Sequence, residues 1–212
     1  NISALVWSND DEPLLDRGYG FEYDALNRIT EGGYGEAVSG SSWQVNHDFS
    51  LQDLSYDFNG NIQALKREGY DNSYSGNGRI DNLKYYYNGN QLIAVDDATN
   101  QAYGFDDNGS SFDPNNPTTT AEYSYDNNGN MTGDDNKGIY RISYNHLNLP
   151  TSLVFESFAE LIFTYDASGV KCKKEYYDDH HLMSSYDYCG NFVYVDSHLD
   201  HIITAEGRIK VL

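Results

Sequence analysis

The sequence contains few residues of the kinds that cross-link a protein or give it positive charge. Of 212 residues, two are Cys, four are Pro and 13 are Lys or Arg, against 33 Asp and Glu. The net charge of −20 argues against a general nucleic-acid binder, which needs a basic face for phosphates. It argues equally against docking on an anionic membrane surface. Two cysteines, Cys172 and Cys189, are too few for a disulfide framework, and they either pair or remain free thiols.

Long apolar segments are also missing. No run approaches the roughly 20 residues that a membrane-spanning helix requires, so we expect no membrane insertion. The first residues have neither the charged segment nor the apolar segment of a signal peptide, and the chain does not begin with Met. We therefore expect a piece of a longer protein. The absence of a signal peptide from this fragment then does not indicate where the whole protein is located.

Aromatic residues compensate for a low content of aliphatic ones. Hydrophobic residues make up 39% of the chain and the mean hydropathy is −0.68, values that suggest disorder when taken alone. However, 20 residues are Tyr and nine are Phe, and tyrosine buries a large ring while keeping a polar tip. A chain of this length buries roughly 70% of its unfolded surface. We therefore expect a folded protein of one large domain or two small ones.

A short motif recurs along the chain. Residues 54–62 and 123–131 each contain an aromatic anchor followed by Asp, with Gly three residues after the Asp. Six weaker or shortened copies bring the period to about 20 residues, after insertions in the first two units. The eight anchors are Tyr23, Tyr56, Tyr87, Phe105, Tyr125, Tyr144, Tyr165 and Tyr188. A tyrosine-rich bias alone would not place turn-forming residues at a fixed offset from the anchors.

Each motif position has a physical reason. Aromatic or apolar residues two positions apart point to one face of a strand. The Asp or Asn after the anchor caps the backbone N–H groups of a turn, and Gly or Asn three residues later tolerates the left-handed conformation of a type I turn with a G1 bulge. The cap positions singled out are Asp24, Asp57, Asp126 and Asp166, and the turn glycines are Gly60, Gly129, Gly169 and Gly190. The shortened copy at Asn88–Gly89 predicts a type I′ turn.

One repeat is therefore predicted to be one β-hairpin, and the chain an all-antiparallel β array forming a curved, spiralling sheet. Repeats share their cores with their neighbours, so we expect a single domain over residues 1–212 with no internal boundary. Helix is poorly supported, and residues 170–175 are expected to continue a strand. Loops are expected where Gly, Ser, Asn and Asp gather, at residues 31–42, 68–78, 109–119 and 133–138.

The motif resembles the YD repeat of the Rhs family, over residues 21 to 210 of this chain. That family includes bacterial polymorphic toxins, insecticidal toxin complexes and the extracellular teneurins. The resemblance implies a sheet that spirals into a hollow shell, which in the toxins encloses a C-terminal effector domain. Residues 186–207 look like the stretch that precedes the Rhs core. Asp113-Pro114-Asn115-Asn116 lacks the Gly of the family's Asp-Pro-x-Gly segments, so no protease residue is carried over.

The resemblance leads us to expect a non-catalytic section of wall from an encapsulating shell, on a secreted or cell-surface bacterial protein. Its partners would be the rest of the shell and a C-terminal effector. Eight hairpins are too few to close a shell of that kind. The unpaired edges of a truncated sheet are templates for pairing, so we also expect edge-to-edge self-association.

No residue pattern indicates catalysis, a metal or a cofactor. His198 and His201 stand three apart, so on a strand they point to opposite faces, and surface histidines are the simpler interpretation. The spacing Asp126-x-Asn128-x-Asn130 is that of a calcium loop, but Gly at the sixth position and Glu at the twelfth are absent. The chain has no phosphate-binding loop, no nucleophile elbow and no zinc-protease motif. We expect no enzyme activity.

The tyrosines outside the anchors offer an alternative function. The anchor rings are expected in the core, packed across strands. Off that face or in loops stand Tyr19, Tyr34, Tyr70, Tyr74 and Tyr86. Exposed tyrosine rings stack on sugars, and nearby amides and carboxylates bind hydroxyl groups. The alternative is therefore an extracellular glycan- or protein-binding β module, with Tyr34, Tyr70 and Tyr74 as its candidate ligand-binding residues.

Overall fold

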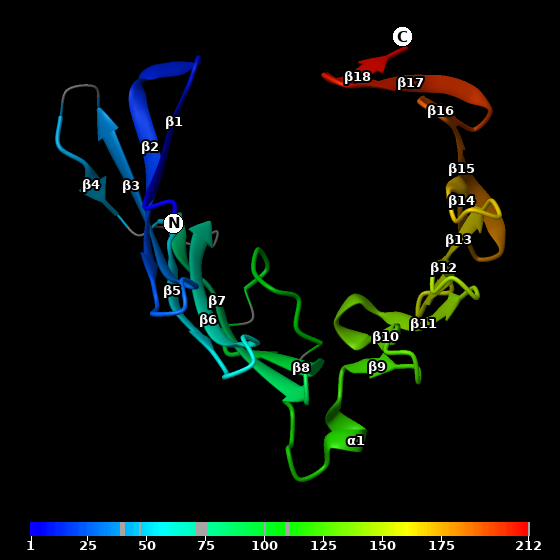
Figure 1. The fold of residues 1–212 in the computed structure, drawn as a ribbon, viewed down its shortest axis with the longest axis horizontal. Helices are drawn as coiled ribbons and strands as arrows, with labels where there is room; N and C mark the ends of the chain where they lie inside the picture. Colours follow the sequence, from blue (N-terminus) through cyan, green and yellow to red (C-terminus); the bar gives the residue numbers. More distant parts are fainter. Residues whose placement is uncertain (39–40, 47, 71–75, 100, 109–110, 212) are drawn as a thin grey trace. The chain divides into compact units, whose positions relative to one another are not determined.

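The computed structural model describes residues 1–212 except 39–40, 47, 71–75, 100, 109–110 and 212. The regular secondary structure of the described residues is almost entirely β-strand (Figure 1), and every strand pairing is antiparallel. The predicted all-β, antiparallel fold is thus confirmed. Within the described residues, no helix has the length and apolar character needed to span a membrane.

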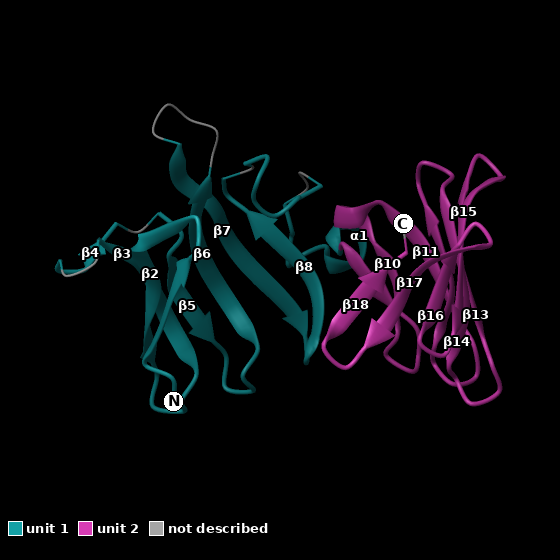
Figure 2. Ribbon diagram, turned by 90° about the horizontal axis from the view of Figure 1, so that it is seen from above, with its two compact units in different colours: residues 1–121 teal, residues 122–212 magenta. Residues whose placement is uncertain are grey.

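The chain divides into two compact units, Asn1–Ala121 and Glu122–Leu212 (Figure 2). Each unit contains one sheet. The sequence shows no boundary near Ala121, and the single domain over residues 1–212 stays a prediction.

The first unit holds an eight-stranded sheet in the order β1-β2-β3-β5-β6-β7-β8, with β4 paired to β3. A single helical turn, α1 (Pro117–Thr120), lies outside this sheet. The strands are β1 (Ala4–Asn9), β2 (Glu12–Tyr23), β3 (Ile29–Val38), β4 (Gln44–Val45), β5 (Leu51–Tyr56), β6 (Ile62–Tyr70), β7 (Asn77–Asn88) and β8 (Gln91–Asp97).

The second unit is a ten-stranded meander whose strands pair in sequence order from β9 to β18. A 3-10 turn, η1 (Asp135–Lys137), follows β10. The strands are β9 (Tyr123–Tyr125), β10 (Met131–Asp134), β11 (Ile139–Tyr144), β12 (Pro150–Phe155), β13 (Glu160–Tyr165), β14 (Lys171–Asp178), β15 (His181–Cys189), β16 (Phe192–Val195), β17 (His198–Thr204) and β18 (Gly207–Lys210).

Several predicted loops are shorter than the sequence suggests. The prediction of a loop over 31–42 is wrong for residues 31–38, because β3 pairs with β2 from Ile29 through Val38. The glycines of this segment are typical of a loop. A strand nevertheless tolerates them when the neighbouring strands supply its backbone hydrogen bonds. Strands β6, β7 and β10 likewise extend into the predicted loops 68–78 and 133–138. The expected strand at residues 170–175 is confirmed by β14.

The repeats correspond to hairpins at every anchor except one. Each of the others lies at or one residue before the end of a hairpin's first strand. Phe105 lies outside any strand, between β8 and α1, so the predicted hairpin at that copy is wrong. Its backbone N–H donates to a side chain of β7, Asp81 Oδ1, at 2.5 Å, and not to the backbone carbonyl of a paired strand. Gly109, the turn residue of that copy, lies outside the described residues.

Candidate functional site

The hairpins close with one recurring turn. At the second copy, the Asp57 backbone N–H donates to the Asn61 carbonyl at 2.9 Å, and the Gly60 N–H donates to the Asp57 carbonyl at 3.2 Å. Asp57 Oδ1 accepts the N–H groups of Asn59 and Asn61, each at 2.8 Å. Gly60 has a φ of 91°. These bonds form the type I turn with a left-handed bulge residue that the motif predicts. The same pattern is built at Asp24, Asp126, Asn145 and Asp166.

The shortened copies turn differently from the prediction. Asn88 pairs with Gln91, so the central residues are Gly89 and Asn90 rather than Asn88 and Gly89. Gly89 has a φ of 62°, whereas Asn90 is not in the left-handed region. The predicted type I′ turn is therefore wrong, since that turn requires positive φ at both central residues. The copy at Gly190 (φ 59°) follows the same scheme.

The turn carboxylates are held in their charged form. At Asp126, the hydrogen bond from the Asn130 amide and the N–H groups of the turn lower the pKa below its ordinary value of 3.8. The pKa values of Asp24, Asp57 and Asp166 are lowered for the same kind of reason, with backbone or side-chain donors as the main cause. Hydrogen bonds to a carboxylate favour its charged form.

We expect acid to loosen these turns. A carboxylate whose pKa is lower in the folded chain stabilises it fully above its unfolded pKa, and that stability is lost as the pH falls through the folded pKa. Asp126→Asn keeps the acceptor oxygen, as the natural Asn145 does, but removes the charge. We expect its melting temperature to lie below that of the unsubstituted chain at pH 6, with the gap closing as the pH falls below about 4 and through the lowered pKa of Asp126. A gap that stays constant over this range would contradict the role of the charge.

Four of the anchor tyrosines join their hairpin to the one before it. The Tyr56 hydroxyl donates to the Ile29 carbonyl at 2.8 Å, and the Tyr165 hydroxyl donates to the Pro150 carbonyl at 2.9 Å. Both acceptors are the first residue of the second strand in the preceding hairpin. We call this set of bonds the tyrosine ladder. Its donors are Tyr56, Tyr87, Tyr144 and Tyr165, and the Tyr23 hydroxyl makes a related bond to the Ile2 carbonyl just before β1.

The rings of the ladder are half-buried rather than fully enclosed. Burial is the main cause that raises the pKa of Tyr56, Tyr144 and Tyr165. A buried phenol needs a partner for its O–H group, and the carbonyl at the start of the preceding strand provides one. The sequence predicted that the anchor rings fill the core. In the structure these rings are half-buried, and their hydroxyl groups bond one hairpin to the preceding one.

Asparagine amides add a second row of bonds along the turns. Asn90 Oδ1 accepts the side-chain amides of Asn59 and Asn61, each at 3.0 Å. In the other unit, Asn130 Nδ2 donates to Asn148 Oδ1 at 3.0 Å. Successive turns are therefore bonded to one another beside the tyrosine ladder.

Tyr34 is not an exposed ligand-binding residue. Only 3% of its surface is exposed, and its ring packs edge-on against Tyr19 and Phe49 at centroid distances of 5.4 and 5.2 Å. Its hydroxyl donates to Glu36 Oε1 at 2.7 Å, and burial raises its pKa to about 12. The prediction is wrong because Tyr34 belongs to a strand and faces the aromatic side of the sheet, where the sequence suggested a loop.

Tyr70 is half-exposed and lines a cleft. Its ring lies edge-on to Tyr103, with centroids 5.3 Å apart, and the two side chains are 49% and 55% exposed. The cleft has a volume of about 340 Å³, near the lower limit for ligand pockets. Its lining is Tyr19, Phe49, Arg67, Glu68, Gly69, Tyr70, Ile80 and Tyr103. Tyr74 lies outside the described residues. The sequence missed Tyr103 here because it was assigned to a repeat.

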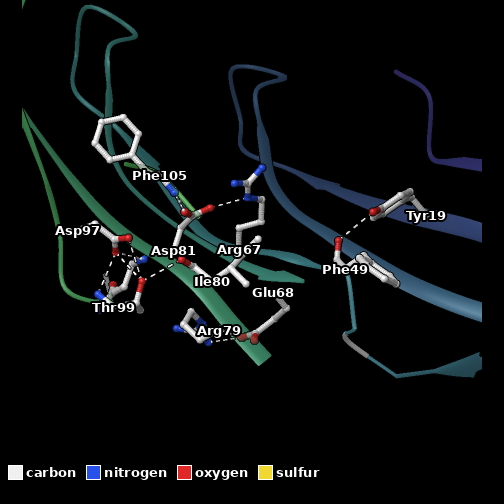
Figure 3. A network of polar contacts seen from close by, with 11 residues as sticks. Tyr19, Phe49, Arg67, Glu68, Arg79, Ile80, Asp81, Asp97, Thr99 and Phe105 are labelled. Carbon is white, nitrogen blue, oxygen red and sulfur yellow. Dashed lines mark hydrogen bonds and ion pairs between the residues drawn. The ribbon is translucent and has the colours of Figure 1, made fainter. Parts of the chain in front are cut away.

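A polar network beside this cleft fixes the segment after β8 onto β7 (Figure 3). Asp81, only 1% exposed, accepts from Arg67 Nε and from the Phe105 N–H. Thr99 Oγ1 donates to the Ile80 carbonyl at 2.9 Å. A Cβ atom added to Gly104 would lie 2.1 Å from that same carbonyl. Only glycine therefore allows the segment to approach β7 so closely.

The remaining candidates do not assemble into a site. In the part of the chain that the structure describes, no group of three or more His, Cys, Asp and Glu side chains is placed to hold a metal ion. The two cysteines are free, Cys172 half-buried and Cys189 exposed. His198 and His201 each bond to a neighbouring Asp through Nδ1.

Comparison with known proteins finds similarity among solved structures alone, since no family model and no curated protein matches. The crystal structure of TcdB2-TccC3-Cdc42 matches with a TM-score of 0.47 and 12% identity, over 96% of this chain and 12% of that chain. TcdB2-TccC3-TEV matches with a TM-score of 0.27 and 11% identity, over 97% and 15%. The Photorhabdus luminescens Tc holotoxin pore matches with a TM-score of 0.26 and 10% identity, over 99% and 15%. This chain therefore spans only a small part of the chains it resembles.

Proposed function

We propose that the chain is a non-catalytic structural wall, a section of a YD-repeat shell that encloses or displays a C-terminal effector domain. The observation that carries the proposal is the tyrosine ladder, in which four hairpins are bonded to the one before them through the same pair of positions. In such an array each unit is stabilised by its neighbours. Nothing in the bonding pattern limits the number of hairpins, so it suits a continuous wall.

The edges of the two sheets support pairing with further wall. Strands β1 and β18 are terminal in their sheets, and the four residues of β18 are all exposed. A free edge carries N–H and C=O groups that another strand can pair with. The expected partners are the remainder of the shell and, for an isolated chain, the edge of a second copy.

The surroundings of this wall follow from the sequence motif. The resemblance to the YD repeat supports a secreted or cell-surface bacterial protein of the toxin kind as the parent of this chain. Enclosure would then be its mechanism, with the tyrosine ladder and the turns keeping the wall continuous. The net charge of −20 keeps copies of such a protein apart and soluble.

The experiment begins with the reading frame on both sides of Asn1 and Leu212. We expect further copies of the motif upstream and an unrelated domain downstream. In the purified parent protein, that downstream domain should resist limited trypsin digestion. Tyr165→Ala removes one hydrogen bond between successive hairpins of the wall. It should speed cleavage of the downstream domain at least tenfold, because proteolysis follows the population of the opened state.

The matched control is Tyr140→Ala, which removes a tyrosine that is 73% exposed and should leave the cleavage rate unchanged. Equal cleavage of the downstream domain in all three proteins would contradict enclosure. A frame without further copies of the motif would contradict the wall itself.

A second candidate is the extracellular binding module, with a glycan or a protein as its ligand. The cleft beside Tyr70 and Tyr103 favours it, because two half-exposed rings lie next to the charged side chains of Arg67 and Glu68. The same reading frame distinguishes the two functions. A frame that ends near Leu212 behind a signal peptide would favour the binding module.

A further inference from the structure

The first unit contains a larger cavity on the side of β2 and β3 where four glycines lie. Gly18 pairs with Gly35, and Gly20 pairs with Gly33, so two successive cross-strand pairs carry no side chain. The cavity above them has a volume of about 460 Å³, within the range of ligand pockets. We call it the glycine trough. The strands that form it are the blue elements β1 to β4 in Figure 1.

The sides of the trough are apolar and exposed. Trp43 lies over one end, where its ring carbon Cη2 would be 3.0 Å from a Cβ atom added to Gly18. Val6 and Val45 flank the same end, opposite Gly18 and Gly35 in the register. Trp43 is 44% exposed, Val6 55% and Val45 64%. Apolar surface left open to water in this way is typical of a contact site.

The other end of the trough carries two carboxylates. Glu22 and Glu31 are directly opposite each other across β2 and β3, and both line the cavity. Like charges in that arrangement destabilise a sheet. Among the residues that the structure describes, neither carboxylate forms an ion pair. A cation from outside the chain would relieve their repulsion.

The trough has room for one long cationic side chain together with part of the peptide that carries it. Gly18 and Glu22 are four residues apart on one strand, so the trough runs about 13 Å along β2. A ligand that matches it has an apolar stem for the glycine floor and a positive head for the carboxylates. Arginine combines such a stem with a planar guanidinium. This group donates paired hydrogen bonds to carboxylates and stacks on aromatic rings. Lysine offers a point charge without this planar geometry.

We propose that the glycine trough binds an arginine side chain of a partner peptide, with the stem over Gly20 and Gly33 and the guanidinium between Glu22 and Glu31. The net charge of −20 favours the approach of a basic partner. This assignment holds whether or not the chain belongs to a shell, because it depends only on β1 to β4 and the segment before β4.

The probe is the peptide acetyl-Gly-Arg-Gly-amide, titrated into the full chain and followed by NMR. The chain has two tryptophans, so the indole N–H signal of Trp43 is identified by its persistence in Trp7→Phe. We expect a saturable shift of this signal with the arginine peptide. The citrulline peptide, which has the same shape but no charge, should give none. An equal response to citrulline would overturn the proposal, and tighter binding of the lysine peptide would overturn the choice of arginine.

Two substitutions test the site without disturbing the fold. A Cβ atom added to Gly20 meets nothing within 4 Å, and its φ is not in the left-handed region. Gly20→Val should therefore fill the trough, abolish binding and leave the melting temperature unchanged or raised. Glu31→Gln should weaken binding at least fivefold. The control Asp16→Asn removes a carboxylate from the same strand outside the cavity and should change the affinity less than twofold. Binding that survives in Gly20→Val, or that falls equally in Asp16→Asn, would overturn the site.

Discussion

Replacing Asp81 by alanine is expected to destabilise the first unit by about 3 kcal/mol, since removing one partner of a buried pair leaves the other uncompensated. Asp81 is 1% exposed and accepts from both Arg67 and the Phe105 N–H. The exposure of Arg67, 50% for its side chain, lets water solvate the released guanidinium and keeps the cost from being larger. The Phe105 N–H loses its acceptor, so the segment after β8 should detach from β7.

The measurement is urea unfolding followed by tryptophan fluorescence. Both tryptophans, Trp7 and Trp43, lie in the first unit, so the signal reports on that unit. Asp53→Asn is the matched control, because it breaks an ion pair with Lys66 in which the Asp53 side chain is 66% exposed, and Asn tolerates the left-handed φ of 51° at this position. Such surface pairs contribute about 1 kcal/mol or less. Equal losses of stability in the two variants would show that the buried network does not hold the segment.

Replacing Tyr165 by alanine is expected to lower the free energy of unfolding by about 2 to 3 kcal/mol. The full range for large aromatic residues is about 3 to 5 kcal/mol, and Tyr165 is only half-buried. The loss has two parts, the contacts of the ring and the hydroxyl bond to the Pro150 carbonyl at 2.9 Å. That bond connects β13 to the beginning of β12, one hairpin earlier.

Tyr165→Phe separates these two parts. It removes the hydroxyl and keeps the ring, and should cost about 1 kcal/mol. Tyr140→Ala, at a side chain that is 73% exposed, should cost less than about 0.5 kcal/mol. Chemical unfolding followed by far-ultraviolet circular dichroism gives all three values. If Tyr165→Ala unfolded at the same denaturant concentration as Tyr140→Ala, the tyrosine ladder would have no energetic weight.

The predictions for Asp81 and Tyr165 both concern the bonds that connect one hairpin or segment to the preceding one. In the second unit the connection repeats, because Tyr144 and Tyr165 each donate to the first residue of the second strand in the preceding hairpin. In the first unit it becomes irregular where the copy at Phe105 does not form a hairpin. There the buried carboxylate of Asp81 replaces the regular bond and holds the segment across β7.

The local structure was largely predictable from the sequence. The cap residue Asp57 and the left-handed Gly60 determine a turn within five consecutive residues, and the same bonds appear wherever the motif is complete. A turn of this kind depends on the backbone freedom of Gly and on a side-chain acceptor two to four residues away from the N–H groups that it caps. The alternation of apolar residues likewise predicts hairpins and an antiparallel sheet.

The sequence by itself thus determined the turns, the hairpins and the all-β class of this protein, because the interactions responsible lie within a few residues of each other. Only the tertiary structure decided that Tyr34 is buried, that Phe105 leaves the repeat, and that Glu22 faces Glu31 across a floor of glycines. Each of these depends on residues that come from other strands. Strand register sets such contacts, and a motif confined to one hairpin does not encode it.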